Sequence, residues 1–246
     1  MHCCSLVMTR VTDEPALVLH TRPYEDNGLM VDLLTLHEGR LSAIKKGVRG
    51  KSQGNNLQVF SLLLASWYGR GEMMTLTKLN DVRNHWLSGE TAAAAYYIVE
   101  LIVRTVRERE PVPLVFASAC NGIAELAAGR SSSLVLRPFE QQLLTELGYG
   151  LDFAQDVTGA PIQAAGCYRL LPSLGFERLE QAVPGSLEHY AGVHLLAIAE
   201  ADFSGSKARA AAKRIFQSSL QPLLGEQPLR SRDLLQPAKD QPGLAP

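Results

Sequence analysis

Three short apolar runs decide the fold of the N-terminal half: ALVLH at residues 16–20, LMVDLLTL at 29–36 and LSAIK at 41–45. Each run has the length of a single strand and is too short for a typical helix. The turn-forming pair Glu38-Gly39 separates the second run from the third. The pattern predicts consecutive strands joined by tight turns.

Two further apolar runs, 59–68 and 73–79, lie on either side of Gly69-Arg70-Gly71, which is predicted to form a hairpin turn. Residues 15 to 82 are therefore expected to form about five strands in a small antiparallel barrel. Between the third and fourth strands, residues 47–56 hold three glycines and two asparagines and contain no large apolar residue. This composition predicts a loop that is mobile or that a ligand orders.

The pattern becomes helical after residue 84. Residues 90–109 are rich in alanine, contain no proline and place Tyr97, Leu101 and Val106 near helical spacing, which favours a long helix. Residues 149–185 are richer in glycine and proline and are expected to form a linker or irregular insert. The other helices are predicted at 115–128, 134–147, 186–201 and 207–224, and the tail 237–246 is expected to be disordered.

Composition excludes several classes of protein. The 246 residues are 46% hydrophobic and 20% charged, which is typical of globular domains, and 24 basic against 25 acidic residues give a net charge of -1. No apolar run is long enough to span a membrane. The cysteines form no C-x-x-C pair, so neither a zinc ribbon nor a disulfide framework is expected. A reducing, cytoplasmic setting is expected instead. They are Cys3, Cys4, Cys120 and Cys167.

Positive charge is concentrated locally although the total is almost neutral. Residues 39–71 contain six basic side chains and no acidic one. Phosphates respond to the field within roughly 8–10 Å, so such a patch can bind a polyanion. The alternative is a solvated strand edge that discourages aggregation. Tyr24 is the favoured stacking aromatic, whereas Phe60 and Trp67 are expected in the core. The six cations are Arg40, Lys45, Lys46, Arg49, Lys51 and Arg70.

A second basic cluster falls on the helix predicted at 207–224. Lys207 and Arg214 share one face, and helical spacing places Arg209 and Lys213 on another part of the surface, so the charge is expected to spread around the helix. The alternative is a solubilising surface that faces the acidic pair Glu200 and Asp202.

Motifs for catalysis are incomplete. Gly50-Lys51-Ser52 lacks the earlier glycine of a phosphate loop, and His37-Glu38 lacks the second histidine of a zinc protease. The carboxylates of a magnesium-dependent nuclease are available, but their spacing does not demand such a site. They are Asp13, Glu14, Glu25, Asp26 and Asp32.

An ordered set of short matches nevertheless covers residues 16 to 235 and resembles the bacterial recombination mediator family RecO. The matches in the first half are ALVLHTRPY at 16–24, LLT at 33–35, GR at 39–40, KGVR at 46–49, KS at 51–52 and WYGRGE at 67–72. Those in the second half are LRPFE at 136–140, LL at 143–144, LGYG at 147–150, AKR at 212–214 and LGEQPLRSR at 224–232.

The resemblance implies an α+β protein: a five-stranded OB barrel over 1–84, a mostly α-helical domain over 85–236 and a short tail. It implies a protein without catalytic residues or cofactor that binds single-stranded DNA and duplex ends and anneals complementary strands. With RecR, such a protein promotes RecA loading on DNA coated by the single-strand-binding protein SSB. Some members carry a four-cysteine zinc module, but residues 152–175 contain only Cys167, so no metal is expected.

Combining the charge pattern with the resemblance gives specific site residues for a cytoplasmic, nucleoid-associated monomer that binds no membrane. An adaptor that binds partners through its barrel and contacts DNA weakly is the alternative. The residues expected to bind DNA are Arg22, Tyr24, Arg40, Lys45, Lys46, Arg49, Lys51, Arg70, Lys207, Lys213 and Arg214. Those expected to bind the SSB C-terminal tail are Arg137, Phe139 and Leu143.

Overall fold

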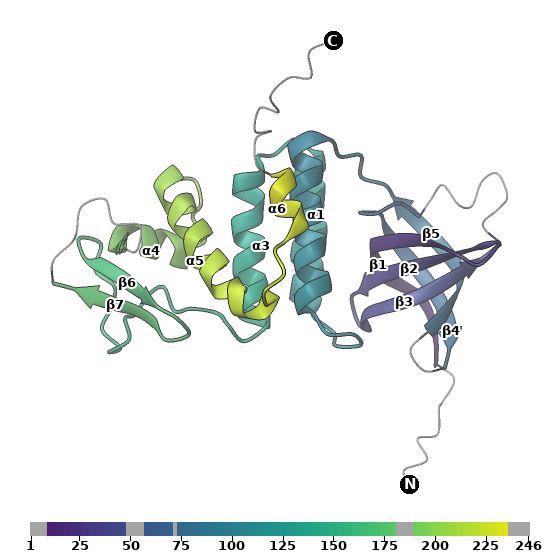
Figure 1. Ribbon diagram of the computed structural model, residues 1–246, viewed down its shortest axis with the longest axis horizontal. Coiled ribbons are helices and arrows are strands. Elements are labelled where there is room, and N and C mark those ends of the chain that lie inside the picture. The colour runs from purple at the N-terminus through teal and green to yellow at the C-terminus, as the bar shows by residue number, and fades with distance from the viewer. Residues whose placement is uncertain (1–8, 48–56, 71–72, 181–188, 236–246) are drawn as a thin grey trace, which may run out of the picture. The chain divides into compact units, whose positions relative to one another are not determined.

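The computed structural model describes residues 9–47, 57–70, 73–180 and 189–235. The chain divides into two compact units, Met1–Ala128 and Gly129–Pro246. The first unit holds a barrel and two helices, and the second holds the remaining helices with a small sheet (Figure 1). Residues 237–246, expected to be a disordered tail, lie outside the described residues. The domain bounds expected from the sequence stay a prediction.

Five strands close the barrel in the order β1-β2-β3-β5-β4, which confirms the predicted OB-type architecture. Strands β3 and β5 run parallel over 42–45 and 73–76, and every other neighbouring pair is antiparallel. The expectation of a wholly antiparallel barrel was therefore wrong at this closure. Strands β1 and β3 both run antiparallel to β2, and β1 and β5 both run antiparallel to β4. Strands β1, β3 and β5 therefore point the same way, and β3 and β5 meet in parallel. The strands are β1 (Thr9–Tyr24), β2 (Gly28–Thr35), β3 (Gly39–Lys46), β4 (Leu62–Gly69) and β5 (Met73–Arg83).

Strand β1 is much longer than the apolar run at 16–20 because its two halves pair with different neighbours. The first half pairs with β4 and the second with β2. A register shift between Val11 and Glu14 lets the strand bend, and Asp13 takes a left-handed φ of 51° there. The Asp13 amide donates to Ser66 Oγ at 3.0 Å, which holds the bend against β4.

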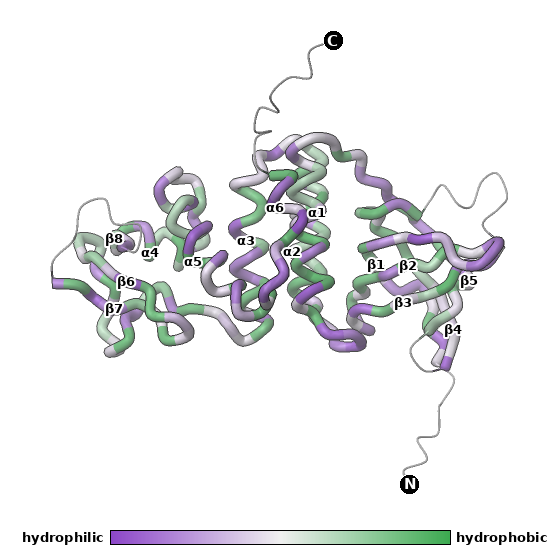
Figure 2. The backbone as a smooth tube through the Cα atoms, in the orientation of Figure 1, coloured by the Kyte–Doolittle hydropathy of each residue, from purple (hydrophilic) through white to green (hydrophobic). Residues whose placement is uncertain are grey.

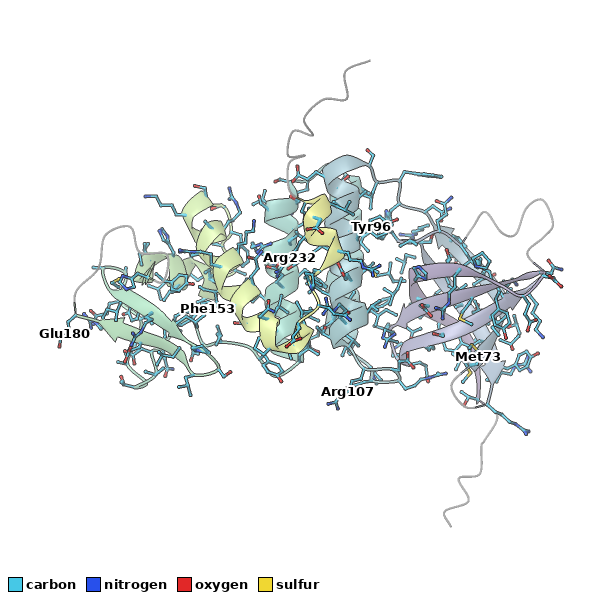
Figure 3. The ribbon with its side chains drawn as sticks, in the orientation of Figure 1. Met73, Tyr96, Arg107, Phe153, Glu180 and Arg232 are labelled. Atoms are coloured by element: carbon cyan, nitrogen blue, oxygen red, sulfur yellow. The ribbon has the colours of Figure 1, made fainter. Side chains whose placement is uncertain are left out.

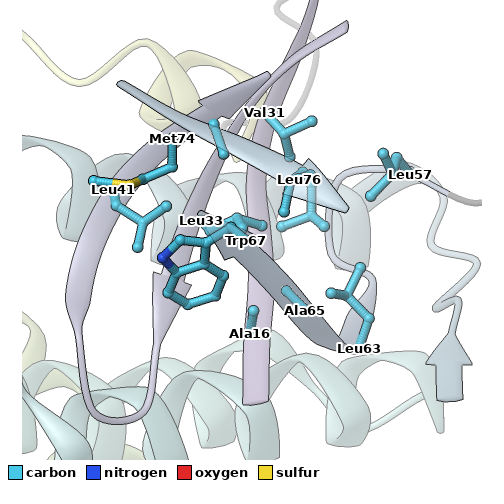
Figure 4. Packing of buried hydrophobic residues seen from close by; sticks show 12 residues of the cluster. Ala16, Val31, Leu33, Leu41, Leu57, Leu63, Ala65, Trp67, Met74 and Leu76 are labelled. Atoms are coloured by element: carbon cyan, nitrogen blue, oxygen red, sulfur yellow. The ribbon is translucent and has the colours of Figure 1, made fainter. Parts of the chain in front are cut away.

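The barrel core is a continuous apolar cluster built from alternate residues of all five strands. The indole of Trp67 lies at its centre with Leu33, Leu41 and Met74 around it (Figure 4). Figure 2 shows hydrophobic stretches along the barrel strands and hydrophilic residues at its turns. Phe60 and Trp67 are buried, which confirms them as core residues. The Trp67 Nε1–H finds no hydrogen-bond partner among the described residues.

The first unit continues with α1 (Gly89–Thr105) and α2 (Pro113–Ala127), close to the predicted bounds. Each buries a stripe of apolar side chains, and Pro113 begins α2 where its missing N–H costs no helical hydrogen bond. The ring of Tyr96 in α1 packs in an edge-to-face arrangement on the ring of Phe60, which lies just before β4, and the ring centroids are 4.9 Å apart (Tyr96 is labelled in Figure 3). These helices therefore belong to the same packed unit as the barrel.

The second unit contains a three-stranded sheet where an irregular insert was expected. Its order is β7-β6-β8, and residues 149–185 supply two of these strands, so that expectation was wrong. Strands of five residues or fewer give too little alternation to be recognised in the sequence. Phe176 and Phe153 bury their rings 5.2 Å apart beneath the sheet. The strands are β6 (Cys167–Leu171), β7 (Gly175–Leu179) and β8 (His189–Ala191).

Four helices among the described residues complete the second unit. Helices α3 (Ser132–Glu146) and α5 (Ser206–Leu224) begin and end within two residues of their predicted bounds. The helix expected at 186–201 is shorter, because β8 precedes α4 (Gly192–Ala199), and α6 (Arg230–Leu234) follows α5. No helix among residues 9–47, 57–70, 73–180 and 189–235 is both long and apolar enough to cross a membrane.

Candidate nucleic-acid interface

Two rows of residues on the outer side of the sheet run across the barrel strands. In the first, Tyr24 of β1 is opposite Gly28 of β2, which in turn is opposite Lys46 of β3. Directly paired residues point to the same side of a sheet, so these three share the outer face. Tyr24 Cδ1 lies 3.4 Å from the point where a Cβ on Gly28 would stand. Glycine therefore leaves the room that brings the Tyr24 ring and the Lys46 ammonium to one shallow pocket.

The second row surrounds the barrel. Register places Arg22 opposite Met30 and continues through three further strands before it returns to β1. Arg22 lies over Met30, with Nε and Nη2 at 3.1 and 2.8 Å from its sulfur. Tyr68 is 39% exposed, whereas Met30 and Ile44 are buried, each 8% exposed. We call both rows together the barrel band: Arg10, Arg22, Tyr24, Gly28, Met30, Ile44, Lys46, Tyr68 and Thr75.

The barrel band includes residues that sequence reasoning left out of the site. Arg10 lies opposite Tyr68, which lies opposite Thr75, so a cation and an aromatic ring become neighbours. They are 58 positions apart in the chain, and only the strand register brings them together. The alternation of Tyr68 with buried Trp67 was the one available signal that its ring faces outward.

The remaining cations of the basic run take different places. Lys45 pairs with Leu29 of β2 and Leu76 of β5, so it lies on the opposite side of β3 from Lys46, and its Nζ is 3.4 Å from the Thr77 carbonyl oxygen. Arg70 is exposed at the β4–β5 turn. Arg49 and Lys51, which were expected to bind DNA, lie outside the described residues, as does most of the loop predicted at 47–56. The turn beside Tyr24 also carries the acidic residues Glu25 and Asp26, which line the same shallow pocket as Lys46.

Arg40 has a structural role that its charge does not reveal. Its guanidinium Nη1 lies 3.3 Å from Glu108 Oε1, and its Nε donates to the Val106 carbonyl oxygen at 3.2 Å. The Arg109 amide donates to the Arg40 carbonyl oxygen at 2.9 Å. Gly39 has φ +71°, and a Cβ there would overlap the backbone of Glu110. The Gly39-Arg40 pair therefore docks the segment after α1 onto β3, and we exclude Arg40 from the interface.

A further row on the outer face carries a serine, an aspartate and a histidine without the arrangement of a catalytic triad. Ser42 Oγ donates to Asp32 Oδ1 at 2.5 Å, and His20 Nδ1 is 4.0 Å from Asp32 Oδ2. The carboxylate stands between the other two groups, so the histidine does not reach the hydroxyl as a base. Within the part of the chain that the structure describes, no three His, Cys, Asp or Glu side chains are grouped to hold a metal ion.

The residues expected to bind the SSB tail lie inside the protein. Arg137, Phe139 and Leu143 of α3 are 5%, 1% and 0% exposed. Arg137 Nη1 is 2.7 Å from Glu140 Oε2, an ion pair within one helical turn. A docking groove needs accessible side chains, so these three residues do not offer one. The sequence pattern did not show that these side chains are buried.

The basic cluster of α5 converges more than helical spacing suggested. Lys207, Lys213 and Arg214 line one pocket between α5, α4 and β8. Arg209 faces elsewhere, and its Nη1 donates to the Phe203 carbonyl oxygen at 2.6 Å. The expectation of charge spread around the helix was wrong for Lys213. Hydrogen bonds from the Ser204 side chain and then from the Ser204 amide lower the pKa of the Asp202 carboxyl. Asp202 therefore stabilises the turn before α5.

Comparison with known proteins decides the family. Residues 8–85 match the profile described as "Recombination protein O N terminal", and residues 87–233 match "Recombination protein O C terminal". The chain belongs to the RecO family. A DNA repair protein RecO of Pseudomonas paraeruginosa is 40% identical over 96% of this chain and 99% of its own. The RecO of Stutzerimonas stutzeri is 38% identical over 93% and 95%, and that of Pseudomonas putida 38% over 92% and 98%.

Membership of the RecO family gives the chain a role in DNA repair and recombination. The two profiles meet between residues 85 and 87, at the passage from β5 to α1. The RecO N-terminal match therefore covers the barrel and its band, and the C-terminal match runs from α1 into α6. The sequence resemblance to this family is confirmed.

Proposed function

We propose that this chain binds single-stranded DNA along the barrel band and the adjoining Lys45, and that it anneals complementary strands without catalytic chemistry. The observation that carries the proposal is the row Tyr24–Gly28–Lys46, in which an aromatic side chain and a lysine line the same shallow pocket. Proteins that bind single strands without sequence preference combine such cations with stacking rings. The RecO family membership supplies the nucleic-acid context.

The chemistry of the band favours binding that tolerates any sequence. Lysine and arginine neutralise phosphates, which carry no sequence information, and tyrosine stacks on the face of any base. The base edges then stay free for pairing with a second strand. Annealing follows because screened backbones approach each other while the bases select the partner.

We further propose the partners and place of action that the family membership suggests. The chain acts in the cytoplasm on nucleoid DNA and its duplex ends, binds RecR and the acidic SSB tail, and promotes RecA loading on SSB-coated strands. The tail contacts a surface other than the buried set at Arg137. An acidic peptide needs an exposed cation beside apolar side chains.

A strand-annealing assay with and without SSB tests this function. Complementary labelled strands are mixed with wild-type protein and with a Tyr24→Ala/Lys46→Ala variant, in which both side chains of the deciding row are removed. Wild type accelerates annealing of bare and SSB-coated strands, and the variant does so at least about 10-fold more slowly, because one stacking contact alone is worth roughly 1–3 kcal/mol. An unaltered rate in the variant would remove the band from the mechanism.

A protein-interaction adaptor with weak DNA contact is the alternative. The observation in its favour is the pair of carboxylates, Glu25 and Asp26, at the shallow pocket of the band. These charges oppose phosphates near Lys46. An adaptor would show little single-strand affinity even at low salt, whereas the proposed function requires strong binding there.

A further inference from the structure

The pocket on α5 is a second cationic site, in the unit that does not contain the barrel. Lys207 and Arg214 are seven residues apart on one helical stripe, and Ala210 and Ala211 form the floor between them. Lys213 lies beside Arg214 at the same rim. We call this the α5 pocket. His189 of β8 and His194 of α4 complete its wall, and no carboxylate lines it among the described residues.

The wall of the α5 pocket is already organised. The guanidinium of Arg214 lies over the ring of Tyr190, with its Cζ 4.9 Å from the ring centroid. Tyr190 is buried, so the ring is a fixed support for the cation. A cation held in this way has less side-chain freedom to lose when a ligand binds.

We propose that the α5 pocket is a second binding site for a nucleic-acid strand, and this proposal deepens the proposed function. At 1.5 Å per residue, Lys207 and Arg214 stand roughly 10 Å apart along the helix. The phosphates of one stacked strand recur about every 3.4 Å, so this stripe spans several of them. The alanine floor lets the backbone of a strand approach the helix closely. Two strand sites on one chain bring complementary strands together.

The spacing of the cations favours a strand over an acidic peptide. A peptide tail that ends in a carboxylate is recognised by one cation beside an apolar hollow that receives its last side chain. The α5 pocket instead has cations at both ends of a small-residue stripe, and its histidines add further N–H groups along the wall. This arrangement fits evenly repeated charge.

The test measures how many short strands one full-length chain binds. A labelled oligothymidylate of about 6 nucleotides occupies one site without bridging, since an OB fold alone covers roughly 4–16. The informative variant is Lys207→Ala/Lys213→Ala, because both side chains are exposed and alanine favours helix. Arg214 is kept because it packs on Tyr190.

The matched control is Arg107→Ala/Arg178→Ala, which removes the same charge from exposed positions outside both sites. Arg107 points away from the rest of the chain in Figure 3. A further variant, Lys45→Ala/Lys46→Ala, weakens the barrel site alone. Thermal unfolding confirms that each variant is folded.

Wild type and the matched control are expected to bind two oligonucleotides per chain at low salt, and the α5 variant one. Removal of the two lysine contacts also lowers the salt dependence of binding by about 1.4, since each phosphate contact to a single strand contributes roughly 0.7. If the α5 variant still binds two oligonucleotides, the inference is wrong. If that variant instead loses binding of an acidic peptide, the pocket is a peptide site.

The outcomes separate this inference from the proposed function. A wild type that binds one oligonucleotide, lost in Lys45→Ala/Lys46→Ala, overturns the second site and leaves the barrel band in place. If wild type binds a single oligonucleotide and only the α5 variant loses it, the barrel band is overturned as a binding site and the α5 pocket is kept. A wild type that binds none overturns both.

Discussion

Arg40→Ala is expected to weaken folding and to leave DNA binding intact, although Arg40 belongs to the basic run. The variant loses the hydrogen bond from Nε to the Val106 carbonyl oxygen and the ion pair with Glu108. A hydrogen bond to a charged donor contributes roughly 1.5–3 kcal/mol. The ion pair adds only about 0.2–1 kcal/mol, because the Glu108 side chain is 53% exposed and water screens it.

The free energy of unfolding should therefore fall by about 2–4 kcal/mol. For a chain of this size each 1 kcal/mol moves the midpoint by roughly 2–4 °C, so Tm falls by about 4–16 °C. Thermal and urea unfolding followed by circular dichroism measure this change. A double-mutant cycle with Glu108→Gln isolates the ion pair, whose coupling energy should not exceed about 1 kcal/mol.

The same Arg40→Ala protein is titrated with single-stranded DNA well below its new midpoint. Its affinity should stay within about 2-fold of wild type, since an 18% exposed side chain held by Glu108 does not reach a strand. Unchanged stability together with a 10-fold weaker affinity would refute the docking role and return Arg40 to the interface.

Three other changes follow from single positions. Gly39→Ala should lower the free energy of unfolding by about 2–4 kcal/mol in urea titrations, because its φ is +71° and a Cβ would overlap Glu110; equal stability would contradict that reading. Trp86 is 76% exposed and Trp67 is buried. Trp86→Phe should therefore remove most of the fluorescence that acrylamide quenches and leave the blue-shifted emission of Trp67; unchanged quenching would contradict this. Burial raises the pKa of Cys120 from 9.0 to about 12, so its thiolate is about 1000-fold scarcer at pH 8 and iodoacetamide should modify it chiefly after unfolding; rapid native labelling would disprove this.

Local patterns predicted the strands and longer helices because each buries one face and repeats with its own period. The apolar run at 29–36 became β2, and the alanine-rich run at 90–109 became α1. The parallel β3–β5 closure was invisible, since it pairs residues about 31 positions apart through register alone. The strands β6 and β7 were missed because five residues give too little alternation to recognise.

The candidate site shows the same limit. Lys46 and Tyr24 were predicted from charge and exposure, and strand pairing places them on one face. Arg40 looked like another surface cation because Glu108 and Val106 lie more than 60 positions away. Lys213 was assigned to a different face because a helical wheel marks where a side chain starts, whereas its long stem reaches the α5 pocket.

The salt dependence of single-strand affinity tests the central claim most directly. Affinity for a long oligothymidylate is measured over a series of salt concentrations for wild type, Lys45→Ala/Lys46→Ala and the Arg107→Ala/Arg178→Ala control. Neutralising two phosphate contacts should make the logarithmic slope shallower by about 1.4 in the first variant, with weaker binding throughout, and leave the control unchanged. A slope and affinity equal to wild type in Lys45→Ala/Lys46→Ala would contradict DNA binding at this end of β3.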